Sequence, residues 1–225
     1  MLAFWGVYYL GTRPGVEWVL TAGILLVATA LPAWVVFGQL RAGWAELGIT
    51  KHRLVLSVAI SAVLGVGSIF GLVQQAQPGT DLVAHLVANV LVFWEPLFVF
   101  GFLFLRWEKA FGYVAAPVLC GVGFFLQHIG AVSLPVAASF GAFGLFFGVI
   151  FAVTRNLAIL WPLFYGVASA IGTAQSGYAF GWDSVWYGLA LLIGQVVVLA
   201  GVRWWCRGRA TSTPTDSQVA DVPTA

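Results

Sequence analysis

The sequence contains little charge. Only 8% of its 225 residues are Asp, Glu, Lys or Arg, whereas 61% are hydrophobic and 16% aromatic. A soluble globular domain has roughly 25% charged residues, so this composition excludes that class and indicates an integral membrane protein. The ten Lys and Arg residues are spread along the chain rather than gathered in a patch. We therefore expect the lipid bilayer as a partner and no nucleic acid.

Cysteine is also scarce. Cys120 lies in an apolar run and Cys206 lies beside the last hydrophobic stretch. Two cysteines at this spacing indicate neither a disulfide framework nor a zinc-binding motif. The sequence also lacks a nucleotide-binding motif and an internal repeat, so any chemistry must come from polar residues within the hydrophobic runs.

Long uncharged runs predict the topology. A spanning helix needs about 20 mostly apolar residues, at about 1.5 Å rise for each. The sequence predicts an all-α fold, a polytopic membrane helix bundle of about seven transmembrane helices. The expected spans are residues 18–38, 54–73, 82–105, 113–131, 135–153, 157–175 and 184–202. Gly130 and Pro135 weaken helix continuity, so the turn between the fourth and fifth spans is expected near them.

The chain is expected to have three regions. Residues 1–15 are apolar but too short to cross a membrane, because ten helical residues extend only about 15 Å. They predict an N-terminal interfacial segment, without the features of a cleaved signal peptide. Residues 16–205 are the expected transmembrane bundle. Residues 206–225, which are small, polar and Pro-containing, predict a disordered cytoplasmic tail.

Positive charges alternate between the loops. Nine of the ten Lys and Arg residues lie in one set of segments: 39–53, 106–112, 154–156 and the C-terminal segment. The intervening loops have none: 74–81, 132–134 and 176–183. The positive-inside rule then predicts an external amino terminus and a cytoplasmic carboxyl terminus. The membrane that we expect is the plasma membrane of a bacterium. Arg13 alone departs from this pattern.

One acidic residue lies deep inside an expected span. Glu95 is about 16 Å from the cytoplasmic end of the third span, and Pro96 follows it directly. Inserting an acidic side chain at mid-membrane costs about 2.5–3.5 kcal/mol, so Glu95 should face the bundle interior and have a partner. Pro96 is expected to loosen the helix toward a water-filled cavity. The pattern favours a functional carboxylate, and a protonated Glu bonded between helices is the alternative.

A histidine in the fourth span is the second candidate site residue. His128 gains weight beside Glu95, because an imidazole and a carboxylate together bind divalent metals and activate water. Glu95 and His128 are thus the candidate ligands of a divalent metal such as zinc, and a metal-free site is the alternative. Counted from Gly112, His128 lies about 24 Å along its helix, several ångströms nearer the outside than Glu95. An interhelical hydrogen bond is the other interpretation of a lone membrane histidine.

The sixth span contains a polar face. Tyr165, Ser169 and Thr173 are spaced four apart and therefore lie on one side of a helix. Tyr165 is at much the same depth as Glu95, which predicts a shared cavity. A helix-packing stripe of small hydroxyl residues explains the pattern equally well.

Two further groups of residues are expected to act structurally. His85 and Asn89 lie one helical turn apart near the outer surface, about 15 Å along the helix from the acidic residue, and should cap or pack. Gly141, Gly144 and Gly148 predict close helix packing rather than a phosphate loop.

The order of several motifs resembles the CPBP family of intramembrane proteases, which includes CAAX-prenyl proteases and bacteriocin-processing and immunity members. The resemblance covers about residues 40–175. Its segments are ELGITKHR, the span with Glu95, RWEKAFG, FFLQH and FGLFFGVIFAVTRNLAILWP. The family pattern is Glu-Glu-x-x-x-Arg-Gly, then Phe-x-x-x-His, then His-x-x-x-Asn or Asp. Glu95 matches the first Glu, Gly101 matches the glycine, and Phe124 with His128 matches the second motif.

The chain departs from this pattern at several positions. Pro96 replaces the second Glu and Phe100 replaces the Arg. Tyr165 and Ser169 keep the spacing of the third motif, but neither replaces an imidazole as a strong metal ligand.

The resemblance implies an endopeptidase that cleaves a membrane-anchored peptide or protein. In the family a Glu activates water, while histidines and an Asn bind metal or hold the oxyanion. By position, Glu95 would be the general base and His128 a ligand or oxyanion donor, with Tyr165 and Ser169 as oxyanion or polar support. Two alternatives stay open: an inactive relative acting as a membrane scaffold or immunity protein, and a small carrier that couples protons through Glu95. The sequence leaves the oligomeric state open.

Overall fold

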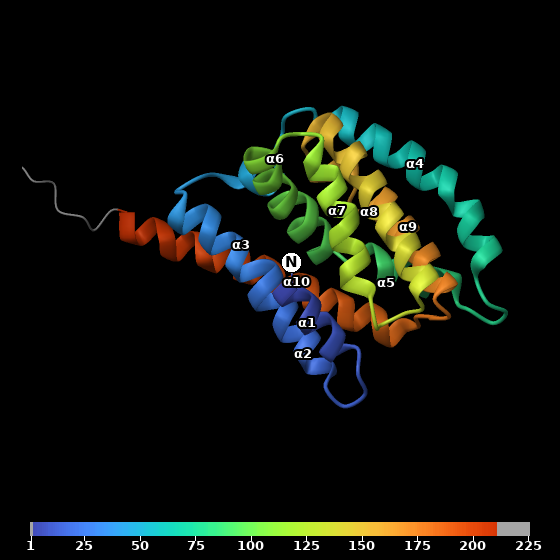
Figure 1. Ribbon diagram of the computed structural model, residues 1–225. Coiled ribbons are helices and arrows are strands. Elements are labelled where there is room, and N and C mark those ends of the chain that lie inside the picture. The colour runs from blue at the N-terminus through green and yellow to red at the C-terminus, as the bar shows by residue number, and fades with distance from the viewer. Residues whose placement is uncertain (1, 211–225) are drawn as a thin grey trace, which may run out of the picture.

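The computed structural model describes residues 2–210, and these form a helical bundle (Figure 1). The described residues contain no β-strand and only one isolated bridge, between Ile129 and Val132. In chain order the elements are α1 (Leu2–Gly11), α2 (Glu17–Leu25), the π-helix η1 (Leu26–Ala30), α3 (Leu31–Ala33), the π-helix η2 (Trp34–Gln39), the 3-10 helix η3 (Trp44–Leu47), α4 (Leu54–Gln75), α5 (Leu82–Val90), the π-helix η4 (Pro96–Phe104), α6 (Leu105–Phe111), α7 (Ala115–His128), α8 (Leu134–Thr154), the 3-10 helix η5 (Leu157–Ile159), α9 (Leu163–Gln175) and α10 (Trp182–Ala210).

Within residues 2–210, four helical stretches are long and apolar enough to cross a membrane. They are Glu17–Gln39, Leu54–Gln75, Leu134–Thr154 and Trp182–Arg209, and the first of them runs continuously from α2 to η2. They agree with four of the expected spans. The all-α fold is therefore confirmed, and the helices indicate a membrane protein. The other three expected spans are shorter or broken.

The expected span 82–105 is not one helix. Helix α5 ends at Val90, the chain turns at 91–93, and a second helical stretch runs from 94 to 111. Pro96 explains the break, because its nitrogen cannot bond the carbonyl of Val92 and its ring would clash with that carbonyl in a continuous helix. The π-type winding of η4 begins directly at Pro96. The break leaves Glu95 at the start of a helix instead of in the middle of one.

Helices α7 and α9 are shorter than the spans expected at 113–131 and 157–175. They contain 14 and 13 residues. Before α9, Pro162 separates the helix from η5, because a proline ring disfavours helical conformation in the residue before it. The turn between α7 and α8 lies where it was predicted, and Gly130 takes a φ of 84° there, a conformation that glycine adopts without strain.

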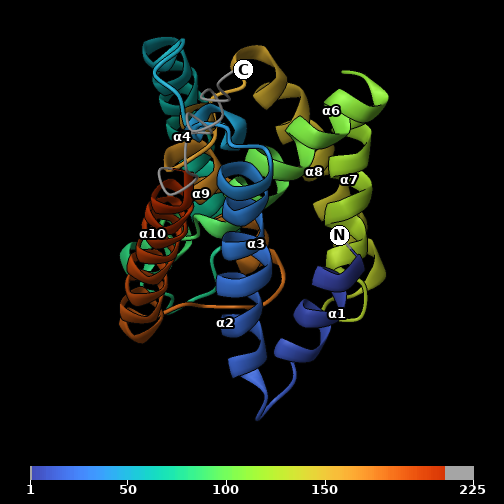
Figure 2. The same cartoon turned by 90° about the vertical axis from the view of Figure 1, so that its left-hand side faces the viewer.

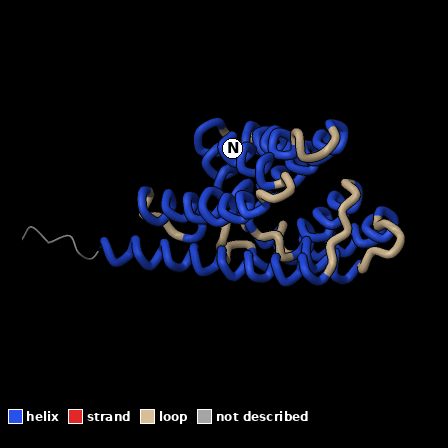
Figure 3. The backbone as a smooth tube through the Cα atoms, turned by 90° about the horizontal axis from the view of Figure 1, so that it is seen from below, coloured by secondary structure: helices blue, strands red, loops and turns tan. Residues whose placement is uncertain are grey.

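Helix α10 is longer than the expected span 184–202, and it lies lengthwise along one side of the bundle (Figure 3). Residues 206–210, expected as part of a disordered tail, continue this helix. The segment contains no proline. Arg207 and Arg209 lie in its last turn, where positive charges interact favourably with the negative end of the helix dipole and stabilise the helix. The rest of the predicted tail, 211–225, lies outside the described residues, as does Met1.

Helix α1, expected as an interfacial segment, packs against α2 and α7 (Figure 2). The Phe4 side chain is fully buried, with its ring centroid 5.2 Å from that of Trp94 and 5.1 Å from that of Phe98. Because Trp94 directly precedes Glu95, α1 helps to enclose the acidic residue.

Helices α7 and α8 make the most extensive helix pair in the bundle. A Cβ atom at Gly144 would lie 2.7 Å from the Cβ of Phe124, and one at Gly148 would lie 2.9 Å from the Cα of Pro117. These distances are too short for any larger residue, so the glycines allow the backbones to approach closely, as expected.

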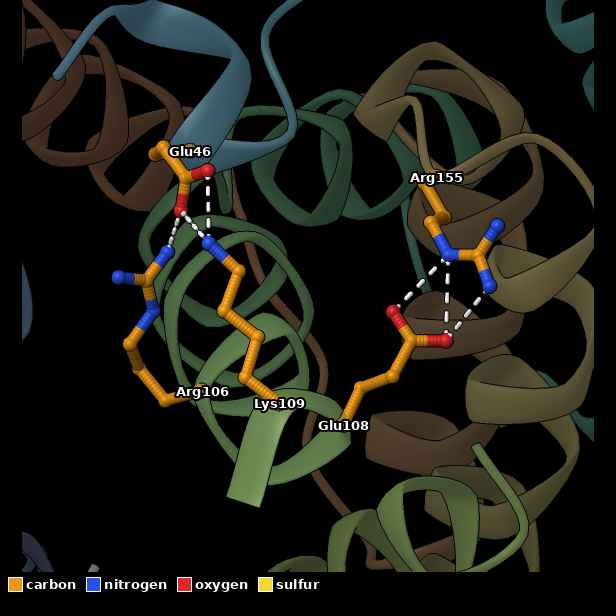
Figure 4. Close-up of polar contacts among 5 residues, drawn as sticks. All are labelled: Glu46, Arg106, Glu108, Lys109 and Arg155. Carbon is orange, nitrogen blue, oxygen red and sulfur yellow. Dashed lines mark hydrogen bonds and ion pairs between the residues drawn. The ribbon is translucent and has the colours of Figure 1, made fainter. Parts of the chain in front are cut away.

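Five charged side chains form two groups of ion pairs that lie near each other (Figure 4). Glu46 forms ion pairs with Arg106 and with Lys109, the latter at 2.7 Å, and Glu108 pairs with Arg155 at 2.7 Å. These contacts join three of the loops in which Lys and Arg were noted. We refer to these five residues as the charged clasp.

Candidate functional site

Glu95 is buried, with 7% of its surface exposed. The Gln127 amide nitrogen in α7 donates a hydrogen bond of 2.5 Å to Glu95 Oε1, and the Tyr165 hydroxyl in α9 donates to Oε2. The interior position and the partner predicted for this carboxylate are both present. Donors from two different helices fix its position, because each oxygen has its own partner.

Gln127 is a site residue that sequence reasoning missed. Its side chain is fully buried, and its Oε1 has no hydrogen-bond partner among the described residues. A buried, unpaired polar atom costs about 1–3 kcal/mol. The available signal was an amide in an apolar helix beside His128, because a buried amide requires a hydrogen-bond partner.

His128 lies in the same region but contacts other groups. Its Nδ1 donates a hydrogen bond of 2.7 Å to the carbonyl oxygen of Phe124. Its ring stacks on Phe140 at a centroid distance of 4.0 Å and meets the edge of Tyr8 at 5.3 Å. Because Nδ1 holds the proton of a neutral ring in this arrangement, Nε2 is an acceptor. The described structure contains no direct hydrogen bond between His128 and Glu95.

Glu95 and His128 line one cavity of about 510 Å³. We refer to it as the central cavity. Tyr165 and Ser169 also line it, so all four predicted site residues border the same cavity. The described residues that line it include ten Phe, Tyr and Trp side chains and no Lys or Arg. Its size is typical of small-molecule sites, about 300–1,000 Å³, and its lining favours apolar groups.

The polar face of α9 divides between two clusters. Tyr165 donates to Glu95, whereas Ser169 donates a bond of 2.8 Å to Asn89 Oδ1 and Thr173 donates to the same oxygen at 3.3 Å. Ser169 therefore lines the central cavity without contributing to the hold on Glu95. Thr173 also lines the central cavity, so Ser169 and Thr173 both border this cavity and join α9 to α5.

The second cluster centres on His85, which is fully buried. Its Nε2 donates to the carbonyl oxygen of Ala170 at 2.9 Å, and its Nδ1 accepts from the Phe180 amide at 3.0 Å. Asn89 Nδ2 donates to the His85 carbonyl at 2.8 Å. Each of these groups is paired, which is the packing function expected for His85 and Asn89.

The donor set does not fit a catalytic zinc ion. Such sites usually present three protein ligands, and no group of three His, Cys, Asp or Glu side chains within residues 2–210 is placed to hold a metal. Both oxygens of Glu95 already accept hydrogen bonds. The CPBP pattern has an arginine at position 100. Here Phe100 is fully buried, and its ring centroid lies 5.7 Å from that of Phe124.

The chain matches no protein-family model, no curated protein and no solved structure. The resemblance to the CPBP family therefore stays a prediction that rests on the motifs quoted above.

Proposed function

We propose that the protein is a membrane-embedded endopeptidase in which Glu95 activates a water molecule. One observation supports this proposal above the others: a buried carboxylate, held by Gln127 and Tyr165, lies on the wall of a cavity large enough for a substrate. Ionisable residues within a membrane are expensive to insert and usually serve a function.

The reaction needs only groups that line the central cavity or contact Glu95. Glu95 takes a proton from water while the water oxygen bonds to the carbonyl carbon of the peptide. As Glu95 becomes protonated it accepts the Tyr165 hydrogen bond less strongly, so this hydroxyl is free to donate to the oxyanion. The C–N bond then breaks, and Glu95 returns its proton to the leaving amine. His128 Nε2 accepts a hydrogen bond from the same water and orients it.

The substrate is a peptide segment of a membrane-associated protein. The central cavity is lined mainly by aromatic and aliphatic side chains, which favours apolar peptide side chains over charged ones. The cavity lies between helices of the bundle, so its substrate would come from the lipid phase.

We further propose seven crossings of a plasma membrane, three of them through the shorter or broken helices. The pairing of Glu108 with Arg155 and of Glu46 with Lys109 supports this topology, because it collects the basic loops at one end. The positive-inside rule assigns that end, and with it the carboxyl terminus, to the cytoplasm.

A peptide library tests the reaction. We would purify the wild-type protein, Glu95→Gln and the control Asp183→Asn in detergent, and measure cleavage together with bound metal. Asp183 is an exposed carboxylate outside the central cavity. The wild type and Asp183→Asn should cleave alike, and Glu95→Gln should be slower by about 100-fold or more. Equal background cleavage by all three proteins would end the peptidase proposal.

A second candidate is a non-catalytic membrane binding protein of the same fold. The observation that favours it is Phe100, whose buried ring occupies the position of the family arginine and packs against Phe124 and Tyr165. In that case the central cavity would retain library peptides uncleaved, and Glu95→Gln would change their affinity without changing any rate.

A further inference from the structure

A second cavity of about 590 Å³ lies between the end of η2 and the last turns of α10. We refer to it as the arginine cavity. Among the described residues, four arginines and no Asp or Glu line it. The arginines are Arg41, Arg203, Arg207 and Arg209. In Figure 1 the ends of the two helical stretches that form it lie on the same side of the bundle.

The arginine cavity differs from the charged clasp beside it. In the clasp, Arg106, Lys109 and Arg155 each have a carboxylate partner. Arg203 forms no ion pair with the carboxylates of the clasp. Its guanidinium lies over the rings of Trp44 at 4.8 Å and Phe37 at 5.3 Å.

One donor of an arginine that lines this cavity has no acceptor among the described residues. The Nη1 of Arg203 is buried and has no hydrogen-bond partner among the described residues. A buried donor on a charged group is especially unfavourable when it is unpaired. Arg207 lies one helical turn further along α10, and like charges at this spacing repel. The arrangement is therefore unfavourable until an anion binds there.

We propose that the arginine cavity binds the phosphodiester headgroup of an anionic membrane lipid. Guanidinium groups pair with phosphate oxygens through two parallel hydrogen bonds, which matches the donors present. A bound phosphate would pair with the guanidinium groups of Arg203 and Arg207 and separate their charges.

The surroundings favour a lipid over free phosphate. Trp34 and Trp205 line the arginine cavity and remain partly exposed, at 43% and 45%, and tryptophan is enriched at the level of the headgroups. Both belong to helical stretches long and apolar enough to cross a membrane. Exposed apolar residues such as Leu31 and Val197 continue along these stretches, where acyl chains would lie.

Lipid titration of the purified full-length protein tests this proposal. Phosphatidylglycerol or zwitterionic phosphatidylcholine would be added in detergent, and retained lipid would be counted by native mass spectrometry alongside the thermal midpoint. Wild-type protein should retain phosphatidylglycerol in preference to phosphatidylcholine. Its thermal midpoint should rise with phosphatidylglycerol concentration, because a ligand that binds only the folded state stabilises it.

Three substitutions sharpen the test. Arg203→Gln and Arg207→Gln should each weaken phosphatidylglycerol binding by about 10-fold or more. Arg13→Gln removes the same charge far along the chain, from a residue that lies over Tyr9 and outside the arginine cavity, and should bind like the wild type. Arg207 is exposed, so its variant should fold even if Arg203→Gln does not.

Two results would overturn the proposal. Equal phosphatidylglycerol binding by Arg207→Gln, Arg13→Gln and the wild type would mean that the cavity is not the site. Competition by millimolar inorganic phosphate as effective as that by the lipid would mean that the site recognises free phosphate. Neither result depends on peptide cleavage, so this test and that of the peptidase are independent.

Discussion

Two buried polar clusters lie within the same bundle and differ in how completely they are hydrogen-bonded. At His85 both ring nitrogens and the backbone carbonyl have partners. At Glu95 both oxygens are held, but the neighbouring Gln127 Oε1 is unpaired and the carboxylate lines an open cavity. The His85 ring therefore has no free nitrogen for a ligand and holds helices together, although Asn89 beside it also lines the central cavity. The Glu95 cluster retains unsatisfied capacity, which is a feature of functional sites.

Helix α9 shows how closely the two clusters adjoin. Tyr165 contacts Glu95, while Ser169 and Thr173, further along the same face, contact Asn89. The difference between the clusters therefore arises from their partners on α5 and α7, because the helix that connects them presents similar hydroxyl groups to both.

The largest expected effect on stability is at the cluster around His85. His85→Leu leaves the Phe180 amide without its partner and removes one of the two side-chain bonds to the Ala170 carbonyl, which keeps that of Thr173. It should lower the free energy of unfolding by about 1–3 kcal/mol. Unfolding in a denaturing detergent series measures this. The exposed His52→Leu is the control and should change little. A loss below about 0.5 kcal/mol for His85→Leu would remove the contrast between the clusters.

The next largest effect concerns the hydrogen bonds to the Glu95 carboxylate. Tyr165→Phe removes one donor and should slow peptide cleavage by about 10-fold to 100-fold, mainly in kcat, since a hydrogen bond to a charged group contributes about 1.5–3 kcal/mol. Tyr113→Phe is the control, because its side chain is 70% exposed and lies outside the central cavity. If the two variants slowed cleavage equally, the Tyr165 hydroxyl would have no special function.

A smaller effect is expected at Gln127. Gln127→Met removes both the donor to Glu95 and the unpaired Oε1, so the stability should stay within about 1 kcal/mol of the wild type. Cleavage should fall, because Glu95 Oε1 loses its positioning contact. A destabilisation as large as that of His85→Leu would show that Gln127, like His85, mainly stabilises the fold.

The smallest effect is expected in the charged clasp. Glu108→Gln weakens the pair with Arg155, whose side chain is 53% exposed, and exposed ion pairs contribute only about 0–1 kcal/mol. The difference from the wild type should shrink as salt is raised from low to high concentration. A salt-independent loss above about 2 kcal/mol would contradict this assignment.

The long spans were predictable because their apolar runs exceed the length that a membrane crossing requires. The break at 91–93 was not, since the residues there are as apolar as those of a continuous span, and Pro96 acts several residues before its own position. The end of α10 was misjudged for a related reason: its polar residues indicated a tail, but none of them stops a helix.

The candidate site was predictable in part. Depth along two helices placed Tyr165 near Glu95, and their hydrogen bond agrees with it. Glu95 and His128 both line the central cavity, although they were expected at different depths. Gln127 was missed because an uncharged amide has no characteristic motif, and only its neighbours in space identify it.

One paired measurement on Glu95→Gln tests the central claim, which is that this acid is present for chemistry and not for stability. Cleavage and the unfolding midpoint would be measured on the same preparation. Cleavage should be lost while the midpoint stays equal to or above that of the wild type, since functional groups are often kept at some cost in stability. Unchanged cleavage, or a midpoint lowered as far as that of His85→Leu, would contradict the claim.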